Sequence, residues 1–113
     1  MIKRTHNCGE LRAKDIGKTI SLNGWISKSR DLGGLTFIDL RDRYGLTQIV
    51  FGEDINKDVF ERAKKLGLED VIGITGAVIK RPEDAVNSDM ETGEIDVEVL
   101  ELDVYNESDP TPF

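Results

Sequence analysis

The side chains best suited to chemistry in this chain lie between residues 28 and 48. Phe37 offers a ring on which an unpaired nucleobase can stack, a contact worth about 1–3 kcal/mol. Gln48 carries a donor and an acceptor in one plane, which suits the reading of a base edge. Lys28 and Arg30 could hold phosphates or stack on a base. These residue types in one short stretch favour a single-stranded nucleic acid as ligand.

Each of these side chains also has an ordinary structural explanation. A surface Phe can pack beneath a loop, and a strand Gln is more often solvated than functional. Lys28 and Arg30 can simply belong to a solvated strand end beside a tight turn. Asp96 could accept a hydrogen bond from a base amino group, but most acids in so acidic a segment are only solvated. On the residues alone, the nucleic-acid-binding explanation and the structural explanation both remain open.

Motifs for catalysis or metal binding are missing from the sequence. His6 and Cys8 supply two possible zinc ligands, fewer than the three or four that a zinc site needs. No glycine-rich phosphate loop with its Lys, catalytic pair of acids, or His with a plausible nucleophile is recognisable. We therefore expect a binding domain without a reaction, cofactor or metal of its own.

Length and charge narrow the class of protein. A chain of 113 residues forms about one domain, and no apolar run approaches the ~20 residues of a membrane span. One cysteine and the lack of a signal peptide favour the cytoplasm. The net charge is −7, but residues 1–48 hold nine Lys and Arg against five acids. A short single strand could therefore bind the basic half, whereas the acidic half would repel a long duplex.

A β-hairpin is expected to position the aromatic and amide side chains. Two alternating runs are joined by a turn whose last residue, Gly45, should adopt a positive φ. Pairing Arg41 with Leu46 makes Phe37 and Gln48 diagonal neighbours on one face. The runs cover residues 35–41 and 46–51, and their core face holds Ile38, Leu40, Ile49 and Phe51.

The rest of the pattern predicts three further strands and one helix. Between Asp54 and Leu66 the period changes to about 3.6, which indicates a helix. The apolar positions of the last strand shift in phase near Leu100, which calls for a β-bulge. The expected elements are a helical turn in 10–16 that packs through Leu11 and Ile16, strands at 18–28, 70–80 and 94–104, and the helix at 54–66.

Three strands, a helix and two strands, with long loops after the first and fourth strands, form the layout of an OB-fold. This all-β, five-stranded Greek-key barrel binds ligands on the face of its second and third strands, and its one helix lies between strands 3 and 4. We expect the barrel to occupy residues 1–108 and residues 109–113 to begin a linker.

The run from Arg30 to Phe51 is the most specific part of a family resemblance. Shorter matching segments are 4–6, 8–12, 22–25, 75–76, 87 and 89–95. Along essentially its whole length the chain resembles the N-terminal anticodon-binding domain of bacterial-type aspartyl-tRNA synthetases. The resemblance implies a non-catalytic domain that grips the anticodon loop of aspartate tRNA. It also implies a homodimeric class II parent enzyme that uses ATP and Mg²⁺ in a C-terminal domain.

The resemblance further implies roles for single residues. The family's Phe at the position of Phe37 stacks on the central uracil, and its Gln at Gln48 hydrogen-bonds to an anticodon base. Arg30 and Leu32 match residues that line the same pocket, while an acid at the position of Asp96 helps to read a flanking base. The expected RNA-binding set is Lys28, Arg30, Leu32, Phe37, Gln48 and Asp96.

Three departures from the family pattern affect this set. The family usually has three arginines at the positions of Lys28, Ser29 and Arg30. Ser29 removes one positive charge, and the ammonium of Lys28 is a less planar donor than a guanidinium. Asp96 is one methylene shorter than the usual Glu, so its base contact would be lost or run through water. Ala85 stands where related sequences carry Asn.

Two other functions fit the residues without the resemblance. A freestanding, sequence-tolerant single-strand-binding OB protein would bind unrelated oligonucleotides about equally, with a steep salt dependence. A protein-interaction module, favoured by the acidic half, would bind no RNA even at low salt.

Overall fold

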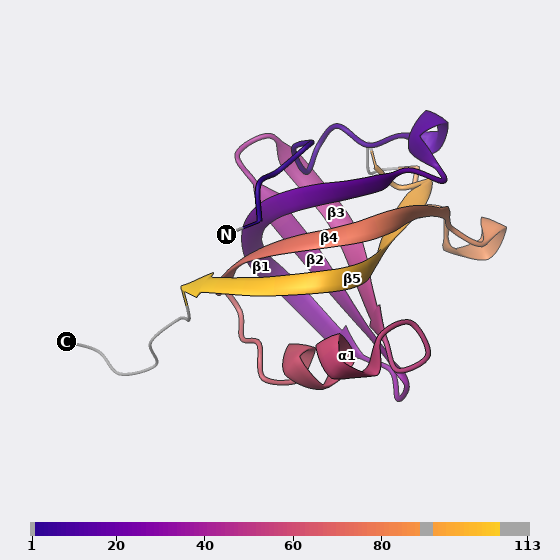
Figure 1. Ribbon diagram of the computed structural model, residues 1–113. Helices are drawn as coiled ribbons and strands as arrows, with labels where there is room; N and C mark the ends of the chain where they lie inside the picture. The colour runs from indigo at the N-terminus through magenta and orange to yellow at the C-terminus, as the bar shows by residue number, and fades with distance from the viewer. Residues whose placement is uncertain (1, 89–91, 107–113) are drawn as a thin grey trace.

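The computed structural model describes residues 2–88 and 92–106, which form a closed barrel of five strands in the order β1-β2-β3-β5-β4 (Figure 1). β3 and β5 pair in parallel, and the other neighbours are antiparallel. This arrangement confirms the predicted OB-fold with one helix between β3 and β4. The elements are η1 (Ala13–Asp15), β1 (Thr19–Asp31), β2 (Leu35–Asp42), β3 (Gly45–Gly52), α1 (Lys57–Ala63), β4 (Val71–Lys80), η2 (Glu83–Ala85) and β5 (Ile95–Asn106).

The barrel core is built from the inward positions of alternating strands. The four hairpin residues predicted for the core face are all buried. One end of the barrel is covered by α1, which buries Val59, Phe60 and Ala63. The helix is shorter than the predicted 54–66: it begins after its cap Asn56, whose Oδ1 accepts a hydrogen bond from the Val59 amide at 3.2 Å, and it ends at Ala63.

The hairpin register is the predicted one, with Arg41 opposite Leu46, but its turn differs. Gly45 pairs with Asp42 and does not take a positive φ, which among described glycines occurs at Gly17 and Gly33. Glycine is needed at 45 for a different reason: an added Cβ would lie 2.5 Å from the Cα of Gly9. The Asp42 carboxylate closes the turn by accepting hydrogen bonds from the backbone amides of residues 44 and 45 at 2.8 and 3.0 Å.

Bulges in β1 and β5 bend the barrel strands. The predicted bulge in β5 is confirmed, since the partners of Gly76 and Thr75 are Val99 and Glu101. Leu100 is left between them and is 39% exposed, so it does not belong to the core face. An unpredicted bulge in β1 lies between Ile26 and Lys28.

Two further expectations, about the loop after β1 and the N-terminal helical turn, are corrected. The loop after β1 is short, because β1 and β2 continue as a paired arm to Asp31 and Thr36. The N-terminal turn is only η1, and Ile16 is 41% exposed whereas Leu11 is buried. The boundary expected at residue 108 lies outside the described residues. No helix in the described part of the chain is long and apolar enough to cross a membrane.

Candidate nucleic-acid interface

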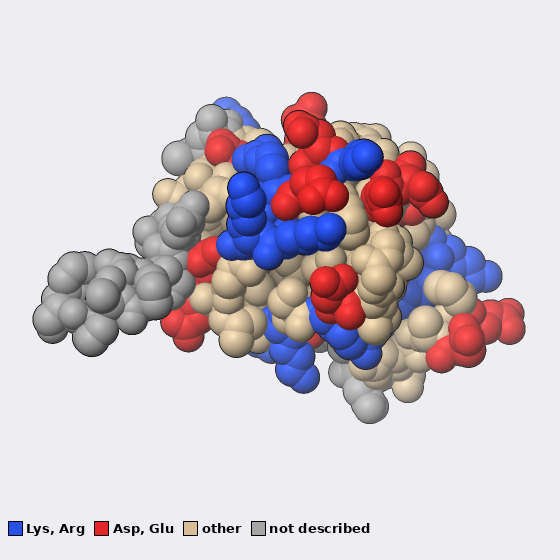
Figure 2. All heavy atoms as spheres, turned by 90° about the horizontal axis from the view of Figure 1, so that it is seen from below, with Lys and Arg blue, Asp and Glu red and all other residues tan. Residues whose placement is uncertain are grey.

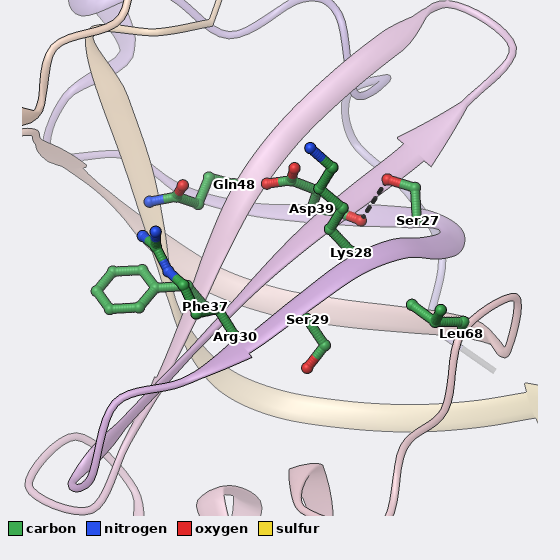
Figure 3. A pocket seen from close by; sticks show the side chains of 8 residues that line it. All are labelled: Ser27, Lys28, Ser29, Arg30, Phe37, Asp39, Gln48 and Leu68. Atoms are coloured by element: carbon green, nitrogen blue, oxygen red, sulfur yellow. Dashed lines mark hydrogen bonds between the residues drawn. The ribbon is translucent and has the colours of Figure 1, made fainter.

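The outer face of the β1–β2–β3 surface carries an open recess of about 530 Å³. Figure 3 shows Phe37 and Arg30 together at one end and Leu68, from the connection between α1 and β4, at the other. The structure thus brings together four residues of the predicted set. The lining residues are Ser27, Lys28, Ser29, Arg30, Phe37, Asp39, Gln48 and Leu68.

The bulge in β1 turns the basic residues toward this recess. Ile26 points into the core, so Lys28 would share that face if the strand were regular. Ser27 is the extra residue, and its Oγ donates to the Asp39 carbonyl at 3.1 Å. After the bulge, Lys28 pairs with Asp39, and residue 30 pairs with residue 37. The side chains of Lys28 and Arg30 therefore lie on the outer face.

Phe37 and Arg30 form a platform at one end of the recess. The Phe37 ring is partly exposed, and the Arg30 Cζ lies 5.7 Å from its centroid. That separation is within the range of a cation–π contact. A flat aromatic surface with a guanidinium beside it can stack a base and balance a nearby phosphate.

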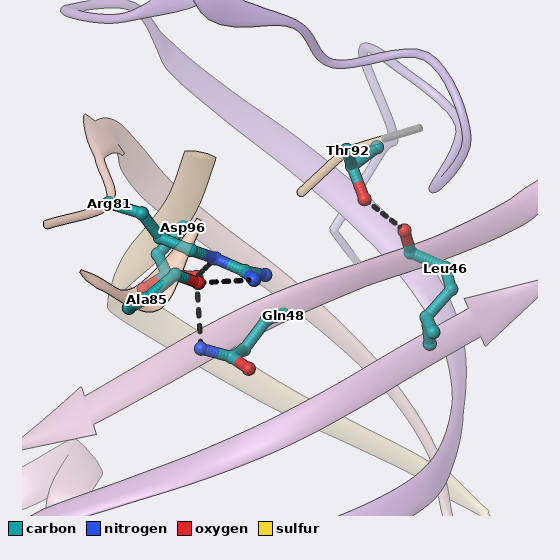
Figure 4. A network of polar contacts seen from close by, with 6 residues as sticks. All are labelled: Leu46, Gln48, Arg81, Ala85, Thr92 and Asp96. Carbon is teal, nitrogen blue, oxygen red and sulfur yellow. Dashed lines mark hydrogen bonds and ion pairs between the residues drawn. The ribbon is translucent and has the colours of Figure 1, made fainter. Parts of the chain in front are cut away.

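Gln48 reaches a buried ion pair behind the recess (Figure 4). Its Nε2 donates to Asp96 Oδ1 at 3.0 Å, and Arg81 Nε donates to the same oxygen at 2.8 Å. Asp96 and Arg81 are only 5% and 4% exposed. Burial raises the pKa of Asp96, although Arg81 and Gln48 act in the opposite direction. Asp96 therefore adjoins the recess through Gln48 and does not line it.

Leu32 is the other predicted residue outside the recess lining. It is 54% exposed in the turn between β1 and β2. Sequence reasoning missed Leu68 and Arg81 as neighbours of the site, and neither has a local signal. By contrast, Asp39 could have been found because the predicted register places it opposite Gln48.

Charge around the barrel is mixed. Figure 2, which views the molecule from below relative to Figure 1, shows a group of Lys and Arg side chains with Asp and Glu beside it. Within the recess, Lys28 and Arg30 face one carboxylate, that of Asp39. Across residues 2–88 and 92–106, no group of three or more His, Cys, Asp or Glu side chains could hold a metal ion.

Comparison with known proteins gives consistent matches. A tRNA anti-codon family model, described as an OB-fold nucleic acid binding domain, matches residues 20–105. The aspartate–tRNA ligase of Bacteroides thetaiotaomicron is 54% identical over 110 residues, covering 97% of this chain and 18% of that protein. The aspartate–tRNA(Asp/Asn) ligase of Anaeromyxobacter sp. (strain K) is 52% identical over 112 residues, covering 99% and 18%.

A solved structure shows the same fold in a related enzyme. The asparaginyl-tRNA synthetase from Pyrococcus horikoshii, complexed with asparaginyl-adenylate, superposes with a TM-score of 0.79. It is 28% identical, and the match covers 99% of this chain and 24% of that one. The chain spans about 18% of the length of the two aspartate–tRNA ligases. Because the family model matches residues 20–105, most of the chain, the chain belongs to the tRNA anti-codon family of OB-fold nucleic acid binding domains.

Proposed function

We propose that this chain binds the anticodon loop of aspartate tRNA and performs no reaction itself. The observation that carries the proposal is the Phe37–Arg30 platform with Gln48 in the same recess of an anticodon-family barrel. In this arrangement the central uracil stacks on Phe37, and Gln48 hydrogen-bonds to its edge. A wrong base is rejected because it leaves polar groups of the recess without partners.

The remaining residues of the predicted set would support this contact. Lys28 and Arg30 neutralise phosphates of the loop, and both face the recess. Leu32, which is exposed in the turn between β1 and β2, offers an apolar contact to a flanking nucleotide. Asp96 is held by its ion pair with Arg81, so its influence on base reading runs first through Gln48.

The proposal for a whole protein rests on the named relatives. Both are aspartate–tRNA ligases more than five times as long as the matched segment, because the match covers 18% of each. We propose that a protein containing this domain is a cytoplasmic homodimer whose C-terminal domain activates aspartate with ATP and Mg²⁺. Binding of the anticodon would then orient the tRNA so that its far end reaches that domain.

The experiment is a titration of the 113-residue chain with three labelled RNAs of equal length at one salt concentration. They are the anticodon stem-loop of aspartate tRNA, the same stem with a scrambled loop, and an unrelated single strand. The proposal expects the first to bind at least ten times more tightly than the others. Equal affinities would favour the sequence-tolerant single-strand binder, and no binding even at low salt would favour a protein-interaction module.

A further inference from the structure

We propose that Asp96, held by Arg81, fixes the amide orientation of Gln48 and thereby makes the recess reject cytosine in favour of uracil. This inference rests on the proposed function, since it concerns how the same recess reads a base. It assigns Asp96 and Arg81 as positioning residues, which act on the ligand through Gln48.

A glutamine amide can present either its oxygen or its nitrogen to a ligand, because the two ends exchange by a half-turn of the terminal torsion. In this barrel one end of the Gln48 amide is already committed. Its Nε2 donates to Asp96 Oδ1 at 3.0 Å, and an ionised carboxylate can only accept hydrogen bonds. A half-turn would place Oε1 against that carboxylate, two acceptors facing each other. The contact with Asp96 therefore favours the orientation in which Nε2 of Gln48 faces the carboxylate.

Arg81 keeps Asp96 in the accepting state. Arg81 Nε donates to Asp96 Oδ1 at 2.8 Å, and a guanidinium does not lose its proton in a protein. Burial raises the pKa of Asp96, so the nearby positive charge is needed to hold the carboxylate ionised. Arg81 is itself fixed by a hydrogen bond from Nη1 to the Ala85 carbonyl at 3.3 Å.

Stability alone does not explain why this ion pair is buried. Buried pairs contribute little to stability and can often be replaced by apolar residues without loss. Here the Arg81 Nη2 atom is also buried without a hydrogen-bond partner among the described residues, which costs stability. A role in orienting Gln48 explains why such a pair is placed directly behind the recess.

The fixed amide makes the recess selective. With Nε2 directed to Asp96, Oε1 is the accepting end of the Gln48 amide that remains for a ligand. Uracil carries a donor N–H at position 3 of its ring, where cytosine has only a lone pair. Oε1 therefore attracts uracil and repels cytosine at this position. If the amide could turn freely, Nε2 would donate to cytosine and the preference would fall.

The test compares stem-loops with uracil or cytosine as the central anticodon base. In the double variant Arg81→Met/Asp96→Leu the ion pair is replaced without leaving a buried charge. We expect the wild type to prefer uracil by about tenfold or more, and the folded double variant to lose most of that preference while its affinity for uracil changes less. Asp15→Asn is a matched control, since Asp15 is also buried and ion-paired, with Lys18, but lies in η1. Its preference should equal that of the wild type.

A second measurement works even if the double variant does not fold. Gln48 is the only glutamine in the chain, so selective ¹⁵N labelling of glutamine side chains reports on one amide group. The proposal expects slow hydrogen exchange of the amide proton that Gln48 donates to Asp96 in the free wild-type chain. Exchange as fast as in an exposed glutamine would overturn it. A folded double variant that keeps the uracil preference would also overturn it, whereas a wild type without any preference would overturn the proposed function itself.

Discussion

Replacing Phe37 by alanine should weaken binding of the anticodon stem-loop without unfolding the barrel. The ring is partly exposed on the outer face of β2, so its removal leaves no large cavity in the core. Stacking of one base on an aromatic ring is worth about 1–3 kcal/mol, which corresponds to an increase in Kd of about 5- to 150-fold. The upper part of this range is expected, because Arg30 lies 5.7 Å from the ring centroid and would lose its cation–π contact as well.

The assay is fluorescence anisotropy with a labelled stem-loop at one salt concentration, accompanied by thermal unfolding of each variant. Tyr44→Ala is a matched control. Tyr44 is 54% exposed and has Arg4 and Arg43 at 5.7 and 5.8 Å from its ring, but it lies at the hairpin tip and does not line the recess. The control should bind within about twofold of the wild type, a change below 0.5 kcal/mol. A loss below twofold for Phe37→Ala, or an equal loss for both variants, would refute the stacking role.

Three other predictions concern charge and burial. Lys28→Ala should weaken all RNAs to a similar degree and reduce the salt dependence of binding by about one phosphate contact; a change in base preference would contradict a phosphate role. Cys8 is buried, and burial together with the negative charge of Asp42 raises the pKa of its thiol, so a thiol reagent should label it only as fast as the protein unfolds. The hydrogen bond from Lys18 lowers the pKa of Asp15 below 3.8, so its stabilisation is present at neutral pH and lost as the pH falls below that value. In urea unfolding, wild type and Asp15→Asn should therefore differ at pH 7 and converge in acid; a constant difference would contradict the assignment.

The strand pattern predicted the fold well because one face of each strand must enter the core. In the β2–β3 hairpin the pairing of Arg41 with Leu46 across the turn gave the observed register, and a slip of one residue would expose Ile38 and Leu40. The bulge in β5 was predictable for the same reason, from a break in phase. The turn was predicted less well, because the requirement for Gly45 comes from its contact with Gly9, a residue far away in the sequence.

The candidate site was only partly predictable. Phe37 and Gln48 followed from the hairpin register, but the placement of Lys28 depended on a β1 bulge that the alternation did not reveal. Neither Leu68 nor Arg81 has a local signal, since each reaches the site from a connection between elements. Contacts of this kind are set by the closure of the barrel rather than by the residues next to them in the chain.

The most direct test of base recognition is the affinity of the 113-residue chain for two stem-loops that differ only in the central anticodon base. Both RNAs have the same length, charge and stem, so the phosphate contribution cancels. Phe37 would stack on either base, and the difference therefore reports the hydrogen bond made by Gln48. We predict that uracil binds about tenfold or more tightly than cytosine. Equal affinity for the two stem-loops would contradict recognition of the anticodon by this recess.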